Sequence, residues 1–154
     1  MPTVCTYELA RAPDAESIAN VSRWLIEAGL QPTWTSARVA WHMQHPESTV
    51  LVARESARMV GFAIMQFGEH SAHLNLLGVL PARQRHGVGR QLVSWFETTA
   101  VTAGIVVITL EVRVTNLGAR AFYESLGYRE LDTIAGYYEG REDALRFKHD
   151  LRVR

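Results

Sequence analysis

The sequence lacks several features that would each point to a particular class of protein. It has one cysteine, Cys5, so no disulfide can form within the chain. No apolar run reaches the roughly 18 to 20 residues that a membrane-spanning helix needs. Residues 1–10 hold no cationic stretch followed by an apolar one, so a secretory signal is not indicated. These absences lead us to expect a cytoplasmic protein without a membrane segment.

An excess of charge of either sign is also absent. The 16 Lys and Arg residues balance the 16 Asp and Glu residues, so no net positive field favours nucleic acid or anionic membranes. The 154 residues, 47% of them hydrophobic, are enough to bury a core, and no repeat or low-complexity segment interrupts them. We therefore expect one domain over residues 1–154, with no DNA or membrane partner, and leave a homodimer open.

The hydrophobic periodicity alternates between that of strands and that of helices. Strands are predicted over residues 3–10, 49–54, 59–67, 72–80, 106–114, 128–138 and 144–151. Helices are predicted from Asp14 to about Gly29, Ser36 to about His45, Val88 to about Gly104 and Asn116 to about Gly127, with Asp14, Ser36 and Asn116 as N-caps. The resulting order, β-α-α-β-β-β-α-β-α-β-β, predicts an α/β (α+β) fold with a mixed sheet and helices on its faces.

A glycine-containing segment lies between the predicted strand 72–80 and the longest helix. It consists of Gln84, Arg85, His86, Gly87, Val88, Gly89 and Arg90. Glycines let consecutive backbone N–H groups converge on an anion, and a helix N-terminus adds positive charge, which suits a pyrophosphate. Two glycines also fit a plain turn. A dinucleotide-binding loop would need three glycines directly after an early strand, and a P-loop would need Gly-Lys-Ser or Gly-Lys-Thr.

Two sequence blocks resemble the acetyl-CoA-binding motifs of the GNAT superfamily. The first is Leu77-Gly78-Val79-Leu80-Pro81 followed by Gln84-x-x-Gly87-x-Gly89, and the second is Asn116-x-x-Ala119-x-x-Phe122-Tyr123-x-x-x-Gly127-Tyr128. The resemblance implies a mostly antiparallel sheet of about seven strands flanked by about four helices, with acetyl-CoA as cosubstrate. It also implies that the backbone of Leu77, Gly78 and Val79 pairs with the pantetheine arm, that residues 84–90 hold the pyrophosphate, and that Asn116 contacts the cofactor.

Two side chains are candidates for proton transfer. Glu111 lies with Thr109 and Arg113 on the polar face of the predicted strand 106–114. It can take a proton from a substrate ammonium if burial raises its pKa, and the alternative is a solvated strand carboxylate. Tyr123 has a phenol that can stay protonated and donate to a leaving thiolate, and the alternative is a core tyrosine. The resemblance assigns the base to Glu111, the acid to Tyr123, and oxyanion stabilisation to a backbone N–H near Val79.

Three local matches resemble the ribosomal-protein N-terminal alanine acetyltransferases. They are Leu110-Glu111-Val112-Arg113-x-x-Asn116, the block around Tyr123, and Gly136-Tyr137-Tyr138 followed by Glu142-Asp143-Ala144-Leu145. This resemblance implies an N-acetyltransferase acting on a protein α-amino group. The alternatives are a GNAT enzyme for a small amine and a non-catalytic acyl-CoA-binding domain, and the presence of both candidate residues argues against the latter. His42 and His45 have a spacing that can serve a metal, but without a partner motif we expect no metal.

Overall fold

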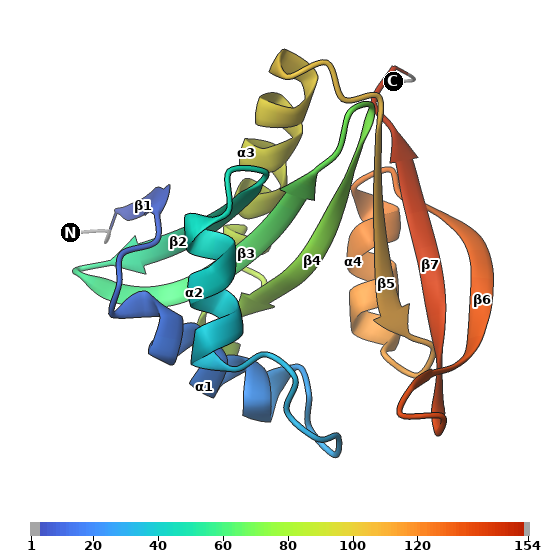
Figure 1. Ribbon diagram of the computed structural model, residues 1–154, viewed down its shortest axis with the longest axis horizontal. Helices are drawn as coiled ribbons and strands as arrows, with labels where there is room; N and C mark the ends of the chain where they lie inside the picture. Colours follow the sequence, from blue (N-terminus) through green and yellow to red (C-terminus); the bar gives the residue numbers. More distant parts are fainter. Residues whose placement is uncertain (1–3, 153–154) are drawn as a thin grey trace.

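The computed structural model describes residues 4–152, which form seven strands and four α-helices (Figure 1). In chain order these are β1 (Cys5–Leu9), α1 (Asp14–Leu25), α2 (Ser36–Gln44), β2 (Ser48–Glu55), β3 (Arg58–Phe67), β4 (Ser71–Val79), α3 (Val88–Thr102), β5 (Val107–Arg113), α4 (Leu117–Ser125), β6 (Arg129–Tyr138) and β7 (Glu142–Asp150). A short 3-10 helix, Pro81–Arg83, follows β4. The predicted order of elements and the predicted fold class are confirmed. Within residues 4–152, no helix is long and apolar enough to cross a membrane.

The seven strands form one sheet in the order β1-β2-β3-β4-β5-β7-β6. Every neighbouring pair is antiparallel except β4 and β5, which are parallel. These two strands pair only between Ser71–His73 and Val107–Thr109, although β4 continues to Val79 and β5 to Arg113. They therefore diverge after one shared end (Figure 1), and we call the gap between them the fork.

Helices cover the two faces of the sheet unequally. On one face, α1 and α2 pack on β2, β3 and β4 through a core that includes Ile18, Val39 and Phe62. On the other face, α3 and α4 pack on a second core that includes Phe96 and Phe147. In Figure 1, α1 and α2 lie in front of the β2–β4 half, whereas α4 lies behind β5. The front of the β5–β7 half thus carries no helix from the described part of the chain.

A bulge in β4 changes which face its side chains occupy. The register between β3 and β4 shifts between Ile64 and Met65, which leaves Asn75 as the extra residue. Leu74 belongs to the core on the α3 side, whereas Leu76, two residues later, belongs to the core on the α1–α2 side. His73 precedes the bulge and lies opposite Thr109, at the last pair before the fork opens.

The helix ends differ from the predicted ones at α1 and α2. Asp14 was predicted as an N-cap, but it lies inside the first turn of α1, where its carboxylate accepts from the Arg11 N–H at 2.7 Å and pairs with Arg54. The side chain that caps α2 belongs to Thr35 and not to Ser36. Asn116 was predicted correctly as the cap of α4, since its side chain accepts from the backbone N–H of Ala119 at 3.1 Å.

Helix α1 also ends at Leu25, earlier than predicted. The buried carboxylate of Glu27 accepts hydrogen bonds from the backbone N–H groups of Thr33 and Trp34, at 2.8 and 3.0 Å, and from the Thr33 hydroxyl at 2.7 Å. These bonds draw the chain after α1 into a loop, so Gly29, with φ of 81°, lies in that loop and not at the helix end.

Candidate active site

The alternation predicted for β5 is present in the structure. Ile108, Leu110 and Val112 are buried in the core on the α3 and α4 side. The side chains between them, among which is Glu111, therefore lie on the face that carries no helix. The polar face of this strand is thus open to the fork.

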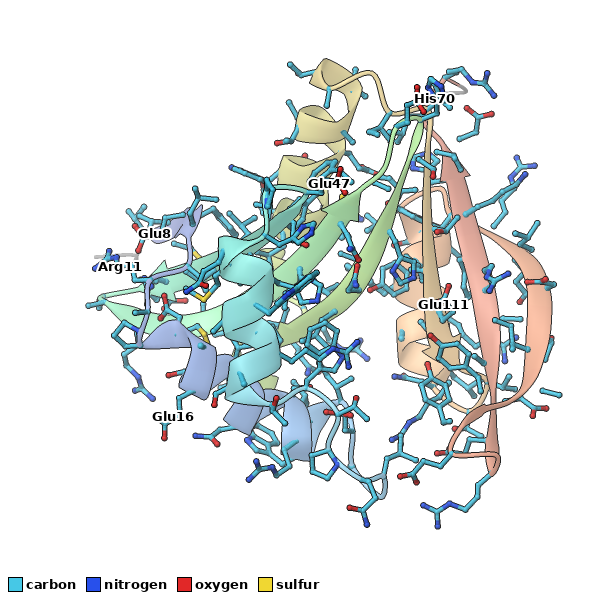
Figure 2. The ribbon with its side chains drawn as sticks, in the orientation of Figure 1. Glu8, Arg11, Glu16, Glu47, His70 and Glu111 are labelled. Atoms are coloured by element: carbon cyan, nitrogen blue, oxygen red, sulfur yellow. The ribbon has the colours of Figure 1, made fainter. Side chains whose placement is uncertain are left out.

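Glu111 joins side chains from three other strands. Its Oε1 lies 2.8 Å from His73 Nε2 on β4 and accepts from the Tyr137 hydroxyl on β6 at 3.3 Å. Its Oε2 accepts from Arg146 Nε on β7 at 3.4 Å. We call these four residues the Glu111 network. Figure 2 shows Glu111 on β5, beside the fork, and only 9% of its side chain is exposed.

The pKa of Glu111 is shifted in the opposite direction from the one that the base hypothesis required. Burial raises the pKa of the carboxyl, but the hydrogen bond and charge of His73, the charge of Arg146 and the hydrogen bond of Tyr137 together outweigh it. The net effect lowers the pKa below its ordinary value of 4.5. The condition that burial raises this pKa is therefore not met, and Glu111 is held as an anion by its neighbours.

His73 is the partner that sequence reasoning missed. Burial alone would lower the pKa of its imidazole, but the hydrogen bond and charge of Glu111, with the contact to Asn75, raise it above 6.5. Asn75 Oδ1 lies 3.1 Å from His73 Nδ1, and Asn75 Nδ2 donates to Gln66 Oε1 at 3.5 Å. Strand alternation could have marked His73 as an outward side chain. Its contact with Glu111 required knowledge of how β4 and β5 pair.

Tyr123 lies on α4 and is buried, with 6% of the residue exposed. Its ring packs against those of Phe122, Tyr128 and Phe147, with centroid distances of 5.0, 5.7 and 6.4 Å. Burial, followed by the nearby Tyr138, raises the pKa of the phenol above its usual value of 10. The ring is therefore part of the core, and the hydroxyl keeps its proton at neutral pH.

The loop at residues 84–90 has a backbone that suits an anion. Arg85 and Gly87 both have left-handed backbone conformations, with φ of 66° and 85°, directly before α3 begins at Val88. A Cβ built on Gly87 would meet nothing within 4 Å, so the backbone there faces open space. A Cβ on Gly89 would lie 3.1 Å from the Phe122 ring, so this glycine lets α3 and α4 approach. We call residues 84–90 the anion loop.

The end of β4 leads into this loop with one edge free. Leu77, Gly78 and Val79 pair with β3, and among the described residues no strand pairs with their other edge. A Cβ on Gly78 would lie 2.5 Å from the Phe62 ring, so packing alone demands glycine there. The Gln84 side chain donates to the Val79 carbonyl at 3.0 Å, which ties the anion loop to the strand.

Of the remaining predicted cofactor residues, some line a hollow beside the anion loop and one, Asn116, lies at the start of α4. His86 and Arg90 line a hollow of about 400 Å³, together with Arg83, Gly87 and residues of β1. Asn116 Oδ1 is already engaged by the N–H of Ala119, which leaves its amide N–H₂ group for other partners. The structure therefore gathers residues 84–90 in one place and leaves Asn116 at the start of α4.

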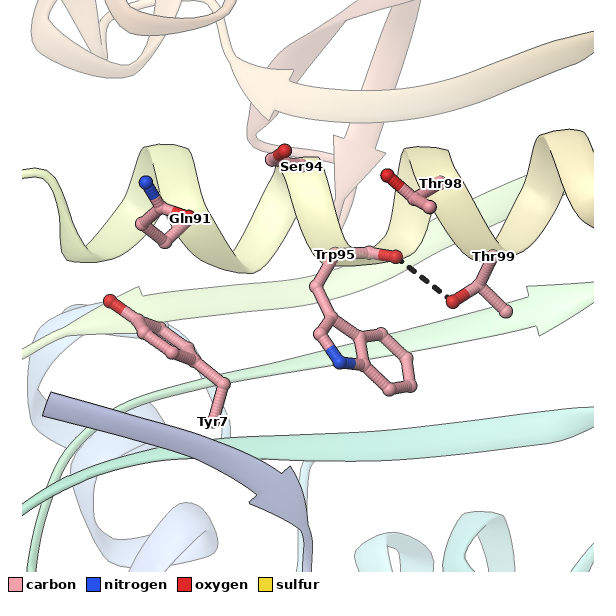
Figure 3. Close-up of a pocket in the computed structure, with 6 residues that line it drawn as sticks. All are labelled: Tyr7, Gln91, Ser94, Trp95, Thr98 and Thr99. Atoms are coloured by element: carbon pink, nitrogen blue, oxygen red, sulfur yellow. Dashed lines mark hydrogen bonds between the residues drawn. The ribbon is translucent and has the colours of Figure 1, made fainter.

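A second hollow, of about 340 Å³, runs between β1 and α3 (Figure 3). It is lined by Tyr7, Gln91, Ser94, Trp95, Thr98 and Thr99. Neither hollow is lined by Glu111 or Tyr123. We place the candidate active site in the fork, because the titratable groups converge there and the lining of the second hollow carries no charge.

Two segments far apart in the sequence meet at the open end of the fork. In the loop between α1 and α2, the Gln31 N–H donates to Glu139 Oε1 at 2.7 Å and the Gly29 carbonyl accepts from Arg141 at 3.3 Å. Glu139 and Arg141 belong to the turn between β6 and β7. Figure 1 shows both segments at the bottom of the fork. Contacts between the two halves therefore form at both ends of the fork.

Comparison with known proteins gives consistent results at the level of sequence. Residues 15–128 match the Acetyltransferase (GNAT) family. The [ribosomal protein bS18]-alanine N-acetyltransferase of Salmonella typhimurium is 42% identical over 91 residues, which cover 57% of this chain and 62% of that protein. An uncharacterized N-acetyltransferase of Methanocaldococcus jannaschii is 31% identical over 133 residues, covering 86% of this chain and 83% of the relative.

The fold comparison extends over nearly the whole chain. The crystal structure of the ribosomal-protein-S18-alanine N-acetyltransferase from Escherichia coli superposes with a TM-score of 0.82 and 28% sequence identity. The superposition covers 96% of this chain and 94% of the other. With the family match over residues 15–128 and the same architecture throughout, the chain belongs to the Acetyltransferase (GNAT) family.

Proposed function

We propose that residues 1–154 form a single acetyl-CoA-dependent N-acetyltransferase domain whose acceptor is the α-amino group of a protein N-terminus. The observation that carries this proposal is the fork itself. It places the buried Glu111 carboxylate, with partners from three other strands, on one side. On the other side it places an edge of β4 that pairs with no strand in the described part of the chain and that leads to the anion loop. One side can hold an amine and the other a thioester cofactor.

The residues present fit acetyl-CoA. The free edge of Leu77, Gly78 and Val79 would pair with the pantetheine amides, and the open backbone at Gly87 would take the pyrophosphate. Acetyl-CoA supplies the activated acetyl group. The amide of Asn116 and the side chains of Arg85, His86 and Arg90 are the further contacts that we assign to the cofactor.

The side chains of the chain itself would then handle charge and protons. Glu111, held as an anion, attracts the acceptor ammonium into the fork and is the group that first accepts its proton. Tyr123 keeps its proton because of burial and can deliver it to the departing thiolate, whose ordinary pKa is about 8.5. A backbone N–H near Val79 would stabilise negative charge on the carbonyl oxygen.

The choice of a protein N-terminus rests on the relatives that carry this name. The Salmonella and Escherichia coli proteins are named for the alanine of a ribosomal protein. The α-amine also suits the site, since its ordinary pKa is near 8, whereas that of lysine is about 10.4. An acceptor of this kind would place the reaction in the cytoplasm.

The test is an acceptor panel with acetyl-CoA, in which free thiol is followed and the product is located by mass spectrometry. A peptide with a free N-terminal alanine should be acetylated at that terminus. The matched control is the same peptide with a blocked terminus and an internal lysine, and it should react far more slowly. Faster reaction with the lysine peptide, a polyamine or an antibiotic would contradict the acceptor but not the acetyl transfer.

A further inference from the structure

We propose that His73 and Glu111 act as a pair in which Glu111 receives the proton of the acceptor ammonium and His73 Nε2 stores it. His73 is thus a positioning and proton-storing residue that acts through Glu111. The inference rests on the proposed function, which it deepens by naming where the proton goes.

The first support is the position of the pair. His73 faces Thr109 at the last paired position of β4 and β5, and its Nε2 reaches Glu111 Oε1 at 2.8 Å across the point where the fork opens. This side-chain contact therefore joins β4 and β5 at the point where their backbone pairing ends. The proton of an amine bound at Glu111 would reach the imidazole in two transfers, the first to Glu111 and the second to His73 Nε2.

Asn75 supplies the second support, because it sets the orientation of the imidazole. Its Oδ1 accepts from His73 Nδ1 at 3.1 Å, while its Nδ2 is directed to Gln66. With both ring nitrogens next to acceptor oxygens, the observed contacts are those of the imidazolium, the state in which the proton is stored. Asn75, the bulge residue of β4, keeps a proton on Nδ1, so the proton that leaves and returns is the one on Nε2.

The third support is the mismatch between Glu111 alone and an α-amine. The pKa of Glu111 is lowered, away from the ordinary value of an α-amine, whereas the pKa of His73 is raised toward that value, so the imidazole holds the proton more readily than the carboxylate does. Within residues 4–152, the charged or titratable groups that act on the pair are Arg146 from β7 and Tyr137 and Tyr138 from β6, with Arg38 from α2 acting on Tyr137. Arg146 keeps Glu111 ionised and disfavours a second positive charge, so the stored proton can leave.

The ammonium N–H bond breaks, the proton passes over Glu111, and an N–H bond forms at His73 Nε2. Glu111 is an anion before and after, the positive charge moves from the amine to the imidazolium, and the amine lone pair is free to attack. His73 then returns the proton to water, which it can reach because 38% of its side chain is exposed, against 9% for Glu111.

The experiment compares wild type with His73→Gln for acetylation of the alanine peptide between pH 6 and 9. The variant should be slower by about 100-fold above the pKa of His73, the lower range for a general base. The ratio of wild type to variant should shrink toward 1 as pH falls and His73 becomes protonated. The control is His70→Gln, an exposed histidine directly before β4 (Figure 2), which should match wild type at every pH.

NMR titration of the imidazole gives a second readout that needs no turnover. The His73 pKa should equal the midpoint of the rate-ratio profile and should fall in Glu111→Gln. A pH-independent ratio, or a His73 pKa unchanged in Glu111→Gln, would overturn the pair while leaving acetyl transfer in place. Absence of transfer from wild type to any amine would overturn the proposed function and the pair together.

Discussion

The anion loop and the Glu111 network both adjoin the fork, but the loop consists of one backbone segment and the network consists of side chains from separate strands. The loop is seven consecutive residues whose backbone is held by two left-handed conformations and one helix start. The network takes one side chain from each of four strands, and His73 and Arg146 are 73 positions apart in the sequence. A site made of backbone depends on local conformation, whereas a site made of distant side chains depends on strand register and charge.

The largest expected effect comes from breaking the network at its centre. Glu111→Gln removes the anion that joins all three partners, and kcat/KM for the alanine peptide should fall by about 1000-fold at neutral pH. Raising the pH should partly restore the rate, because more of the amine is then already deprotonated. The measurement is a pH–rate profile, with Glu130→Gln on β6 as the control carboxylate. A profile equal to that of wild type would make Glu111 a structural carboxylate with no part in proton transfer.

A smaller effect on turnover is expected at Tyr123, a core residue to which we also assign a catalytic role. Tyr123→Phe keeps the ring packing and removes the hydroxyl, so turnover should fall by about 100-fold with unchanged acetyl-CoA affinity. The matched control is Tyr128→Phe, which removes a hydroxyl that donates to Glu97 at 3.1 Å. It should cost about 1 kcal/mol of stability without slowing turnover. Equal turnover in the two variants would exclude Tyr123 from the mechanism.

The anion loop can be tested against a glycine of the same conformation at the other end of α3. Gly87 and Gly104 have φ of 85° and 84°, and a Cβ on either would meet nothing within 4 Å. Replacing either by Ala should cost about 1 to 2 kcal/mol of stability, because left-handed backbone disfavours a Cβ. Only Gly87→Ala should also weaken acetyl-CoA binding, by about 10-fold or 1.4 kcal/mol, measured as a reduced rise in Tm. Equal ligand responses would place the pyrophosphate elsewhere.

The smallest expected effect is a difference in how pH changes the stability lost in a variant of the Glu111 network and in a variant of the anion loop. The folded pKa of His73 is raised, so its contribution to stability is full below the unfolded value of 6.5 and is lost as pH rises through the folded value. His73→Gln should therefore destabilise the protein more at pH 6 than at pH 9, by about 0.5 kcal/mol for a partly solvated pair. Denaturant unfolding at both pH values measures this. The stability lost in Gly87→Ala should not depend on pH, and a parallel change in both variants would refute the distinction.

Regular periodicity allowed most elements to be predicted. Val88, Leu92, Phe96 and Ala100 recur along one stripe of α3, all buried as the pattern indicated. The errors arose where a tertiary contact overrode a local signal. Asp14 has the side chain of an N-cap, but Arg54 from β2 engages its carboxylate, and Gly29 follows a helix that Glu27 had already ended.

The amino-acid sequence alone determined the order of elements, the polar face of β5 and the position of the anion loop, because each depends on residues close together along the chain. Only the tertiary structure decided that His73 meets Glu111 and that the pKa of Glu111 falls instead of rising. The physical reason is that a pKa is set by every charge within a few ångströms. Those charges come from β4, β6 and β7, and it is the pairing of these strands around the fork that brings them together.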